Sequence, residues 1–321
     1  MLAANAAAFA ALGIYVPRMG RPAGASGETL SGHHNVAWQI NGDPRFDPKY
    51  GTLAQLTDEL AATTAPVAVV SSEDFALSHD RPGALEALRE AIAAAGFEPY
   101  VVIYLRTQSS YAGALYAELT QHQGALDCSF DEFSAAVITD GAFRVAFYTL
   151  PFDYAALLRA FETPFGAGRI LVRPYASGGP SDALLRDFIA VIAPDGVTPD
   201  LARLQAPGRL NERVRFSALM ETLRLHYLAV RADLPNIYTL AQGLFGSVDE
   251  TMLEGSFAPI GPAEAARYRA RFAASNDALR ERYGFAWPQE PEPELSETRT
   301  AHHRLMGHAL AVWRAACVPT L

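Results

Sequence analysis

The stretch YVVIYLR, residues 100–106, decides the fold. Its first six residues are continuously apolar, a pattern typical of a parallel β-strand buried on both faces. The segment that follows, about 108–122, has the periodicity of a helix. A buried strand that leads directly into a helix is the repeating unit of α/β proteins.

The same alternation extends to both sides of this stretch. Short β-rich runs predict further strands at 14–16, 66–70 and 169–172. Helical periodicity predicts helices at 2–12, 52–62, 82–95, 153–162 and 181–192. The segment 143–150 fits either a strand or the approach to the helix at 153–162. The order of the elements predicts an α/β fold built on a parallel sheet.

The character of the chain changes after about residue 194. Helices are predicted at 209–230, 235–245, 262–283 and 297–316. A Pro/Glu-rich stretch, 288–294, precedes the last of them and has the composition of an exposed linker. We therefore expect an α/β core over residues 1–195 and a helical region, 196–321, that packs on it.

Composition limits the classes of function. The chain has 321 residues and a formal net charge of −9, so nucleic acid is not an expected partner. No stretch is long and apolar enough to span a membrane, and the first residues lack the basic start of a signal peptide. Cys128 and Cys317 form no metal-binding spacing, and no metal is expected. These features predict a soluble cytoplasmic protein. Lys49 is the single lysine of the sequence.

A carboxylate follows one of the predicted strands directly. Val69-Val70-Ser71-Ser72-Glu73 places Glu73 at a strand's carboxyl end, where ligands bind in open parallel sheets. A carboxylate in such a cleft can serve as a general base toward a hydroxyl. The alternative is structural, because Ser72 is a good N-cap and Glu73 would then lie in the first turn of a helix.

A guanidinium ends the most apolar strand in the same way. Arg106 lies between the strand and the start of a helix, a favourable position for binding phosphate or sulfate. The alternative is an ion pair with a carboxylate of the protein surface. The local sequence favours neither.

Together these segments resemble sulfotransferases. In cytosolic sulfotransferases one strand ends in a catalytic histidine, and the next ends in an arginine followed eight positions later by a serine. Glu73 stands where that histidine would be, and Arg106 matches the arginine, but the position eight residues on is Ala114. The resemblance to bacterial sulfotransferase-like proteins is longer and rests on four segments in order: His33-His34-Asn35-Val36-Ala37-Trp38, Ser71-Ser72-Glu73, Tyr104-Leu105-Arg106-Thr107-Gln108-Ser109-Ser110-Tyr111 and Val172-Arg173-Pro174-Tyr175.

The resemblance implies a fold, a reaction and a set of residues. The fold would be the three-layer parallel sheet of the P-loop and sulfotransferase type. The reaction would move a sulfuryl group from 3′-phosphoadenosine 5′-phosphosulfate to a hydroxyl of a carbohydrate or small metabolite, with Glu73 as the base. The residues implied at the donor site are Arg106, Gln108, Tyr111 and Ser72. Independently of the resemblance, His33, His34 and Arg173 are candidates for binding the acceptor; the alternatives are a loop role for the two histidines and an ion pair within the fold for Arg173.

One part of the family pattern has no match in this sequence. Sulfotransferases hold the phosphosulfate group with a loop of the KTGTT kind, and neither this loop nor GxxxxGK[ST] occurs here. Gly13 to Pro17 matches the segment after that loop, so we expect the chain to be truncated at its N-terminus. Three explanations are open. The natural protein is longer than this sequence, or the chain is a remnant that binds nucleotide weakly or not at all, or another segment or a partner supplies the strand that precedes the loop in sulfotransferases. A P-loop-like nucleotide or sugar kinase is a weaker alternative. The missing lysine-bearing loop argues against a kinase as much as it argues against a sulfotransferase.

Overall fold

The chain folds into two compact units, each assembled from separate stretches of sequence. The computed structural model describes residues 5–24, 30, 32–121, 126, 128–175, 182–194, 260–284 and 287. The first unit comprises residues 1–105, 153–209 and 278–288, and the second comprises 106–152, 210–277 and 289–321. This division differs from the predicted boundary at residue 195. The helices predicted at 209–230, 235–245 and 297–316 and the linker at 288–294 lie outside the described residues.

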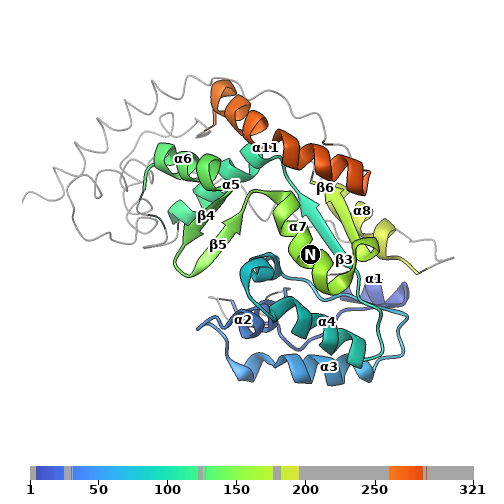
Figure 1. The fold of residues 1–321 in the computed structure, drawn as a ribbon. Helices are drawn as coiled ribbons and strands as arrows, with labels where there is room; N and C mark the ends of the chain where they lie inside the picture. The colour runs from blue at the N-terminus through green and yellow to red at the C-terminus, as the bar shows by residue number, and fades with distance from the viewer. Residues whose placement is uncertain are drawn as a thin grey trace, which may run out of the picture. The chain divides into compact units, whose positions relative to one another are not determined.

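The first unit contains most of the predicted α/β elements (Figure 1). Its helices are α1 (Ala6–Ala11), α2 (His34–Asn41), α3 (Leu53–Ala61), α4 (Ala84–Ala94), α7 (Tyr154–Phe165) and α8 (Ala183–Ile192). Its strands are β1 (Ile14–Tyr15), β2 (Val67–Ala68), β3 (Val101–Leu105) and β6 (Ile170–Pro174). Its 3₁₀ segments are η2 (Pro48–Tyr50), η3 (Glu73–Asp80) and η4 (Ala167–Arg169).

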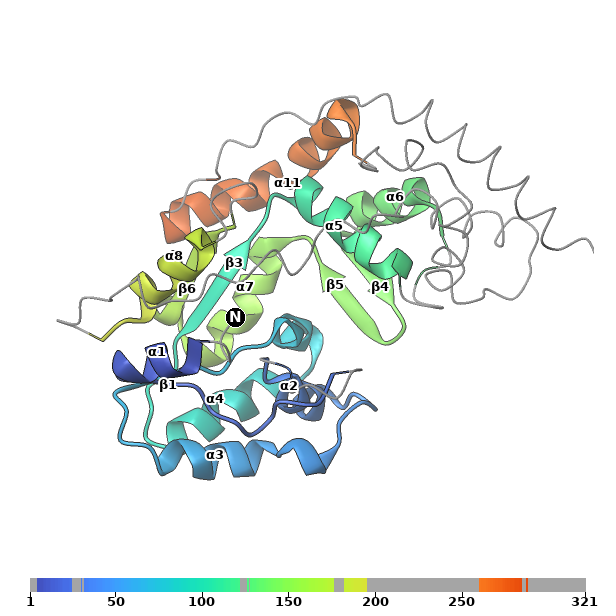
Figure 2. The same ribbon diagram turned by 180° about the vertical axis from the view of Figure 1, so that it is seen from behind.

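The strands of the first unit form two parallel pairs. β1 pairs with β2 in the register Ile14↔Val67, and β3 pairs with β6 over five residues from Val101↔Ile170 onward. The β3–β6 pair is seen from the two sides in Figures 1 and 2. The predicted α/β class is confirmed. In place of one continuous sheet, the described strands form separate two-stranded sheets.

Helices cover both faces of the β1–β2 pair. Ile14 and Val69 belong to an apolar cluster with Leu185 and Ile189 of α8. Tyr15, one residue along β1, packs instead against a larger cluster on the opposite face. The buried members of that cluster include Leu56 and Leu60 of α3, Leu85 and Leu88 of α4, and Leu157, Leu158 and Phe161 of α7. Alternating apolar side chains therefore fill two separate layers, as strand geometry requires.

The stretch that decided the fold is less buried than its sequence predicts. Leu105 is buried, but Val101 to Tyr104 are only half-buried, and Tyr100, before the strand begins, is 55% exposed. The expectation of burial on both faces is therefore wrong for most of this strand. The reason is that β3 pairs on one edge only among the described strands.

The second unit is built around an aromatic core. Its described elements are α5 (Gln108–Gln121), α6 (Phe130–Asp140), β4 (Ala142–Val145), β5 (Tyr148–Pro151) and the first part of α11 (Pro262–Tyr283). β4 and β5 form an antiparallel hairpin, which settles the alternatives for 143–150 in favour of strand. Phe133 and Phe152 are fully buried between α5, α6 and α11, with Tyr116 and Tyr268 against them.

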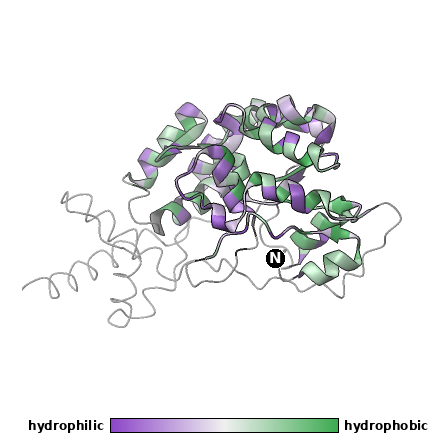
Figure 3. Cartoon of the chain, turned by 90° about the horizontal axis from the view of Figure 1, so that it is seen from below, coloured by the Kyte–Doolittle hydropathy of each residue, from purple (hydrophilic) through white to green (hydrophobic). Residues whose placement is uncertain are grey.

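Two described helices, α2 and α6, were not predicted. α6 begins with a capping box, in which Ser129 Oγ accepts from the Glu132 N–H and Glu132 accepts from the Ser129 N–H. Each described helix carries both hydrophobic and hydrophilic residues (Figure 3). Among them, none combines the length and apolar character needed to cross a membrane.

Candidate functional site

Glu73 stands at the first position of η3, just beyond the carboxyl end of β2. Ser72 caps this segment, because its Oγ accepts a hydrogen bond of 3.2 Å from the Asp74 N–H. The capping arrangement predicted as the structural alternative is therefore present. It does not engage the Glu73 side chain, which is 83% exposed. A carboxylate at this position remains accessible to a substrate.

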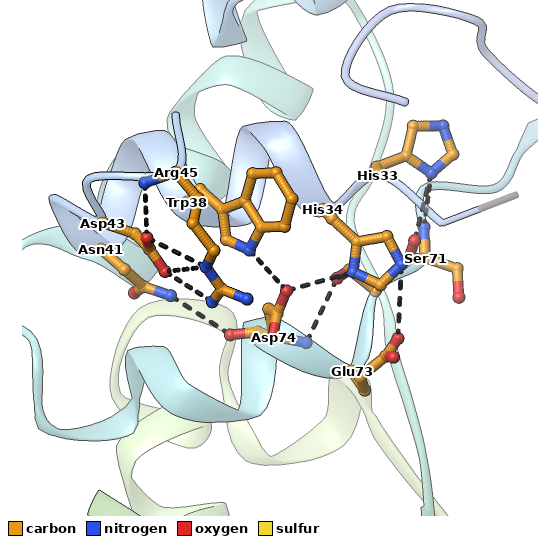
Figure 4. A network of polar contacts seen from close by, with 10 residues as sticks. His33, His34, Trp38, Asn41, Asp43, Arg45, Ser71, Glu73 and Asp74 are labelled. Carbon is orange, nitrogen blue, oxygen red and sulfur yellow. Dashed lines mark hydrogen bonds and ion pairs between the residues drawn. The ribbon is translucent and has the colours of Figure 1, made fainter. Parts of the chain in front are cut away.

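The nearest partner of Glu73 is the imidazole of His34, at the start of α2 (Figure 4). His34 Nε2 lies 3.8 Å from Glu73 Oε2, and His34 Nδ1 lies 3.1 Å from Asp74 Oδ2. Ser72 Oγ also lies 3.1 Å from Nδ1. Asp74 can only accept from an Nδ1–H, whereas the Ser72 hydroxyl can accept from an Nδ1–H or donate to Nδ1, so these contacts allow both tautomers of the neutral ring.

Asp74 is held from two further directions. The indole N–H of Trp38 donates to Asp74 Oδ2 over 2.7 Å, and Asn41 Nδ2 donates to the Asp74 carbonyl over 3.2 Å. His34 and Trp38 are four residues apart on α2, so both reach the same carboxylate from one helix face. The orientation of Asp74 is therefore fixed by the same helix that carries the imidazole.

A cation completes the surroundings of Trp38. The Arg45 guanidinium lies 4.6 Å from the centre of the indole ring and forms a 2.6 Å ion pair with Asp43. The Asp43 side chain is fully buried. This pairing holds a positive charge close to the Trp38 indole (Figure 4).

The environment of His34 favours its protonated form. The hydrogen bond to Asp74 raises the pKa of His34 above its usual value, burial opposes this, and the charges of Glu73 and Asp74 add to the rise. Arg45 acts in the opposite direction. The pKa of His34 is therefore raised, so the imidazolium is more stable here than in a free histidine.

The neighbouring histidine has a different role. His33 is fully buried; its Nδ1 accepts from the Ser71 N–H over 3.0 Å, and its Nε2 lies 3.2 Å from the Pro17 carbonyl oxygen. Burial, together with the charge of Arg21, lowers the pKa of His33 to about 4. The predicted acceptor role of His33 is corrected to a structural one, because both ring nitrogens are bound to backbone.

No protein-family model, curated protein or solved structure matches this chain.

The predicted donor-site residues beyond Ser72 belong to the second unit. Arg106 is half-buried at the start of this unit. Gln108 is buried and exchanges two hydrogen bonds with Asn276, of 2.8 and 3.1 Å. Tyr111 packs on Phe152 with 4.8 Å between ring centres, and burial raises its pKa to about 12. Gln108 and Tyr111 thus form the interior next to Arg106.

Arg173 pairs within the fold. Its guanidinium binds both carboxylate oxygens of Asp187 on α8, with 3.0 Å between Nε and Oδ2, and Tyr104 donates to the same carboxylate over 2.6 Å. Of the two readings of Arg173, the structure shows the ion pair. The acceptor role of Arg173 stays a prediction, for a side chain that is 41% exposed and already paired with Asp187.

The structure brings Ser72, Glu73 and His34 together and adds two residues that the sequence reasoning did not select, Asp74 and Trp38. The sequence held a signal for Trp38, because HNVAW spaces it four residues from His34, on one face of a helix. It held no such local signal for Asp74. Glu73 lies in the first unit and Arg106 in the second, so a cleft shared by both stays a prediction. Among the described residues, no cluster of three or more His, Cys, Asp or Glu has the arrangement of a metal site.

Proposed function

We propose that this chain is a cytoplasmic protein of the sulfotransferase type. It would transfer a sulfuryl group from 3′-phosphoadenosine 5′-phosphosulfate to a hydroxyl of a carbohydrate or small metabolite. The observation that carries the proposal is the exposed carboxylate of Glu73, placed beyond a parallel strand and joined to an imidazole instead of an arginine. Helical layers on both faces of β1–β2 support the three-layer architecture that the resemblance implies.

Each proposed role follows from charge and position. Glu73 and His34, which lie side by side, are the groups available to take up the proton of the acceptor hydroxyl. Arg106 holds the 3′-phosphate of the donor through charge-assisted hydrogen bonds, and Gln108 and Tyr111 give that site its shape. Sulfuryl transfer, like phosphoryl transfer, asks the protein mainly for positioning and charge stabilisation.

A second candidate function has its own supporting observation. Lys49 is the single lysine of the sequence, and its ammonium is paired with Asp47 and lies over the Tyr50 ring. The sequence given therefore offers no lysine-bearing phosphosulfate loop. The second candidate is a non-catalytic member of the same fold that keeps at most weak nucleotide binding at Arg106.

Titration calorimetry with 3′,5′-diphosphoadenosine tests the donor site. Arg106→Ala should weaken binding about 10- to 100-fold, the usual value of hydrogen bonds to a charged group. Arg144→Ala, an exposed arginine of β4 in the same unit, is the matched control and should bind as the parent does. Equal binding by the parent and Arg106→Ala would remove Arg106 from the site.

Turnover separates the two candidates. With the ³⁵S-labelled donor, transfer of label to an acceptor or to water supports the enzyme. Nucleotide binding without any transfer supports the non-catalytic candidate.

A further inference from the structure

We propose that His34 Nε2 is the general base of this site, that Asp74 orients the ring through Nδ1, and that Glu73 stabilises the protonated ring. This inference rests on the proposed function and assigns the proton to a different atom from the one that the sequence suggests. It starts from the bonds that fix the imidazole.

Two side chains contact Nδ1 and fix the orientation of the ring. Asp74 Oδ2 and Ser72 Oγ each lie 3.1 Å from Nδ1, and Trp38 donates to the same Asp74 oxygen. We assign the proton to Nδ1, because the Asp74 carboxylate only accepts, and this assignment leaves Nε2 as the basic nitrogen. That nitrogen points toward the exposed Glu73 carboxylate (Figure 4). The arrangement has the orienting carboxylate on one nitrogen and the reacting position on the other.

Gly32, which has no side chain, leaves room for the imidazole ring of His34. A Cβ added to Gly32 would lie 2.5 Å from His34 Nε2, so glycine at this position is what allows the imidazole to pack where it does. The His34 side chain is 14% exposed, which shields the ring without closing it off.

The charged groups facing His34 come from two segments. Asp74 and Glu73 of η3 favour the imidazolium, and Arg45, beyond Trp38, disfavours it. As the ring takes up a proton, the new positive charge lies between two carboxylates. Both carboxylates then bind the protonated ring more strongly than the neutral one, which is the requirement for a residue that assists a reaction.

The reaction balances as follows. The acceptor hydroxyl oxygen forms a bond to sulfur, and the bond between sulfur and the bridging phosphate oxygen breaks. The electron pair leaves with 3′,5′-diphosphoadenosine, and the hydroxyl proton moves to His34 Nε2. The charge of Glu73, whose Oε2 lies 3.8 Å from that nitrogen, stabilises the protonated ring, which then releases the proton to water.

The first experiment needs no acceptor. Imidazole ¹⁵N chemical shifts of the full chain, followed from pH 5 to 9, report the tautomer and pKa of His34. We expect the Nδ1–H tautomer and a pKa that falls in Asp74→Asn, because the hydrogen bond to Asp74 is the main cause of the rise. Asp80→Asn, at the other end of η3, is the matched control and should leave His34 unchanged. An Nε2–H tautomer, or a pKa indifferent to Asp74→Asn, overturns the proposal.

A chemical probe tests nucleophilicity directly. Diethyl pyrocarbonate should modify His34 at Nε2, at a rate that rises with pH along the same titration. His33, whose nitrogens are bound to backbone, is the internal control and should stay unmodified. A merely structural His34 would be as unreactive as His33, and that result also overturns the proposal.

The second experiment distinguishes this proposal from the proposed function. If labelled donor is turned over, His34→Gln should lower kcat about 100-fold and remove the acidic limb of its pH profile, whereas Glu73→Gln lowers kcat about tenfold. The reverse order would make Glu73 the base. If the chain does not bind 3′,5′-diphosphoadenosine but His34 shows the expected tautomer and reactivity, the sulfuryl donor is wrong and the base is retained.

Discussion

His33 and His34 are predicted to have opposite effects on the free energy of unfolding as the pH falls. His33 is buried neutral, with its pKa lowered from 6.5 to about 4, mainly by burial. Its stabilising contribution is therefore complete above pH 6.5 and is lost as the pH falls toward 4. The pKa of His34 is raised, mainly by its hydrogen bond to Asp74. Its contribution is complete below pH 6.5 and is lost as the pH rises through the raised value.

The magnitude for His33 follows from the two pKa values. Protonation of the unfolded chain, with a pKa of 6.5, competes with folding, while the folded protein resists protonation down to about pH 4. Linkage then gives a loss of about 2 kcal/mol in the free energy of unfolding between pH 8 and pH 5. Since His34 gains stability over the same interval, the parent protein should lose less than this amount.

Urea unfolding followed by circular dichroism at several pH values measures these terms. His33→Gln should abolish the loss between pH 8 and pH 5, whereas His34→Gln should increase it. Each variant is compared with itself at the two pH values, so the cost of the substitution cancels. A His33→Gln protein that loses as much stability as the parent on acidification would refute the assignment of a buried neutral imidazole.

Three further substitutions test other parts of the structure. Gly32→Ala should displace the His34 ring, because its Cβ would meet Nε2 at 2.5 Å, and the NMR-derived pKa of His34 should return toward its usual value. Gln108→Ala should cost about 1–3 kcal/mol in urea unfolding by leaving the half-buried Asn276 amide without its partner, and a double-mutant cycle should show coupling between the two. Glu59 accepts from two backbone N–H groups after β1, and these bonds outweigh burial and lower its pKa, so Glu59→Gln should cost about 1–3 kcal/mol at pH 7 and less below pH 4.5.

Local pattern was enough to predict most of the elements in the first unit. The strands predicted at 14–16 and 100–105 are present within a residue, and the helix predicted at 262–283, which spans both units, has the predicted bounds. These segments have strong periodicity or continuous apolar runs, which local sequence encodes. α2 was missed because its sequence, HNVAWQIN, has weak helix formers at the start and follows a Gly/Ser-rich loop.

The pairing of elements required information that single segments do not carry. The Arg173–Asp187 ion pair joins β6 to α8, and the Gln108–Asn276 pair joins positions 168 residues apart. The sequence shows which side chains are capable of such bonds, but only the packing of helices selects the partner. For the same reason Glu73 was found as a candidate while Asp74, one residue along, was not.

The lone lysine gives the chain a single cleavage point for a lysine-specific protease, the Lys49–Tyr50 bond in η2. A cut there places α2 on one fragment and η3 on the other. α2 remains linked to the following segment through Gln39 Oε1, which accepts from the Leu53 N–H over 2.6 Å, and through Asn35, which donates to the Gly51 carbonyl over 2.7 Å. The two fragments can therefore be tested for recombination. A synthetic 1–49 peptide, isotopically labelled only in the imidazoles of His33 and His34, would be mixed with the fragment 50–321.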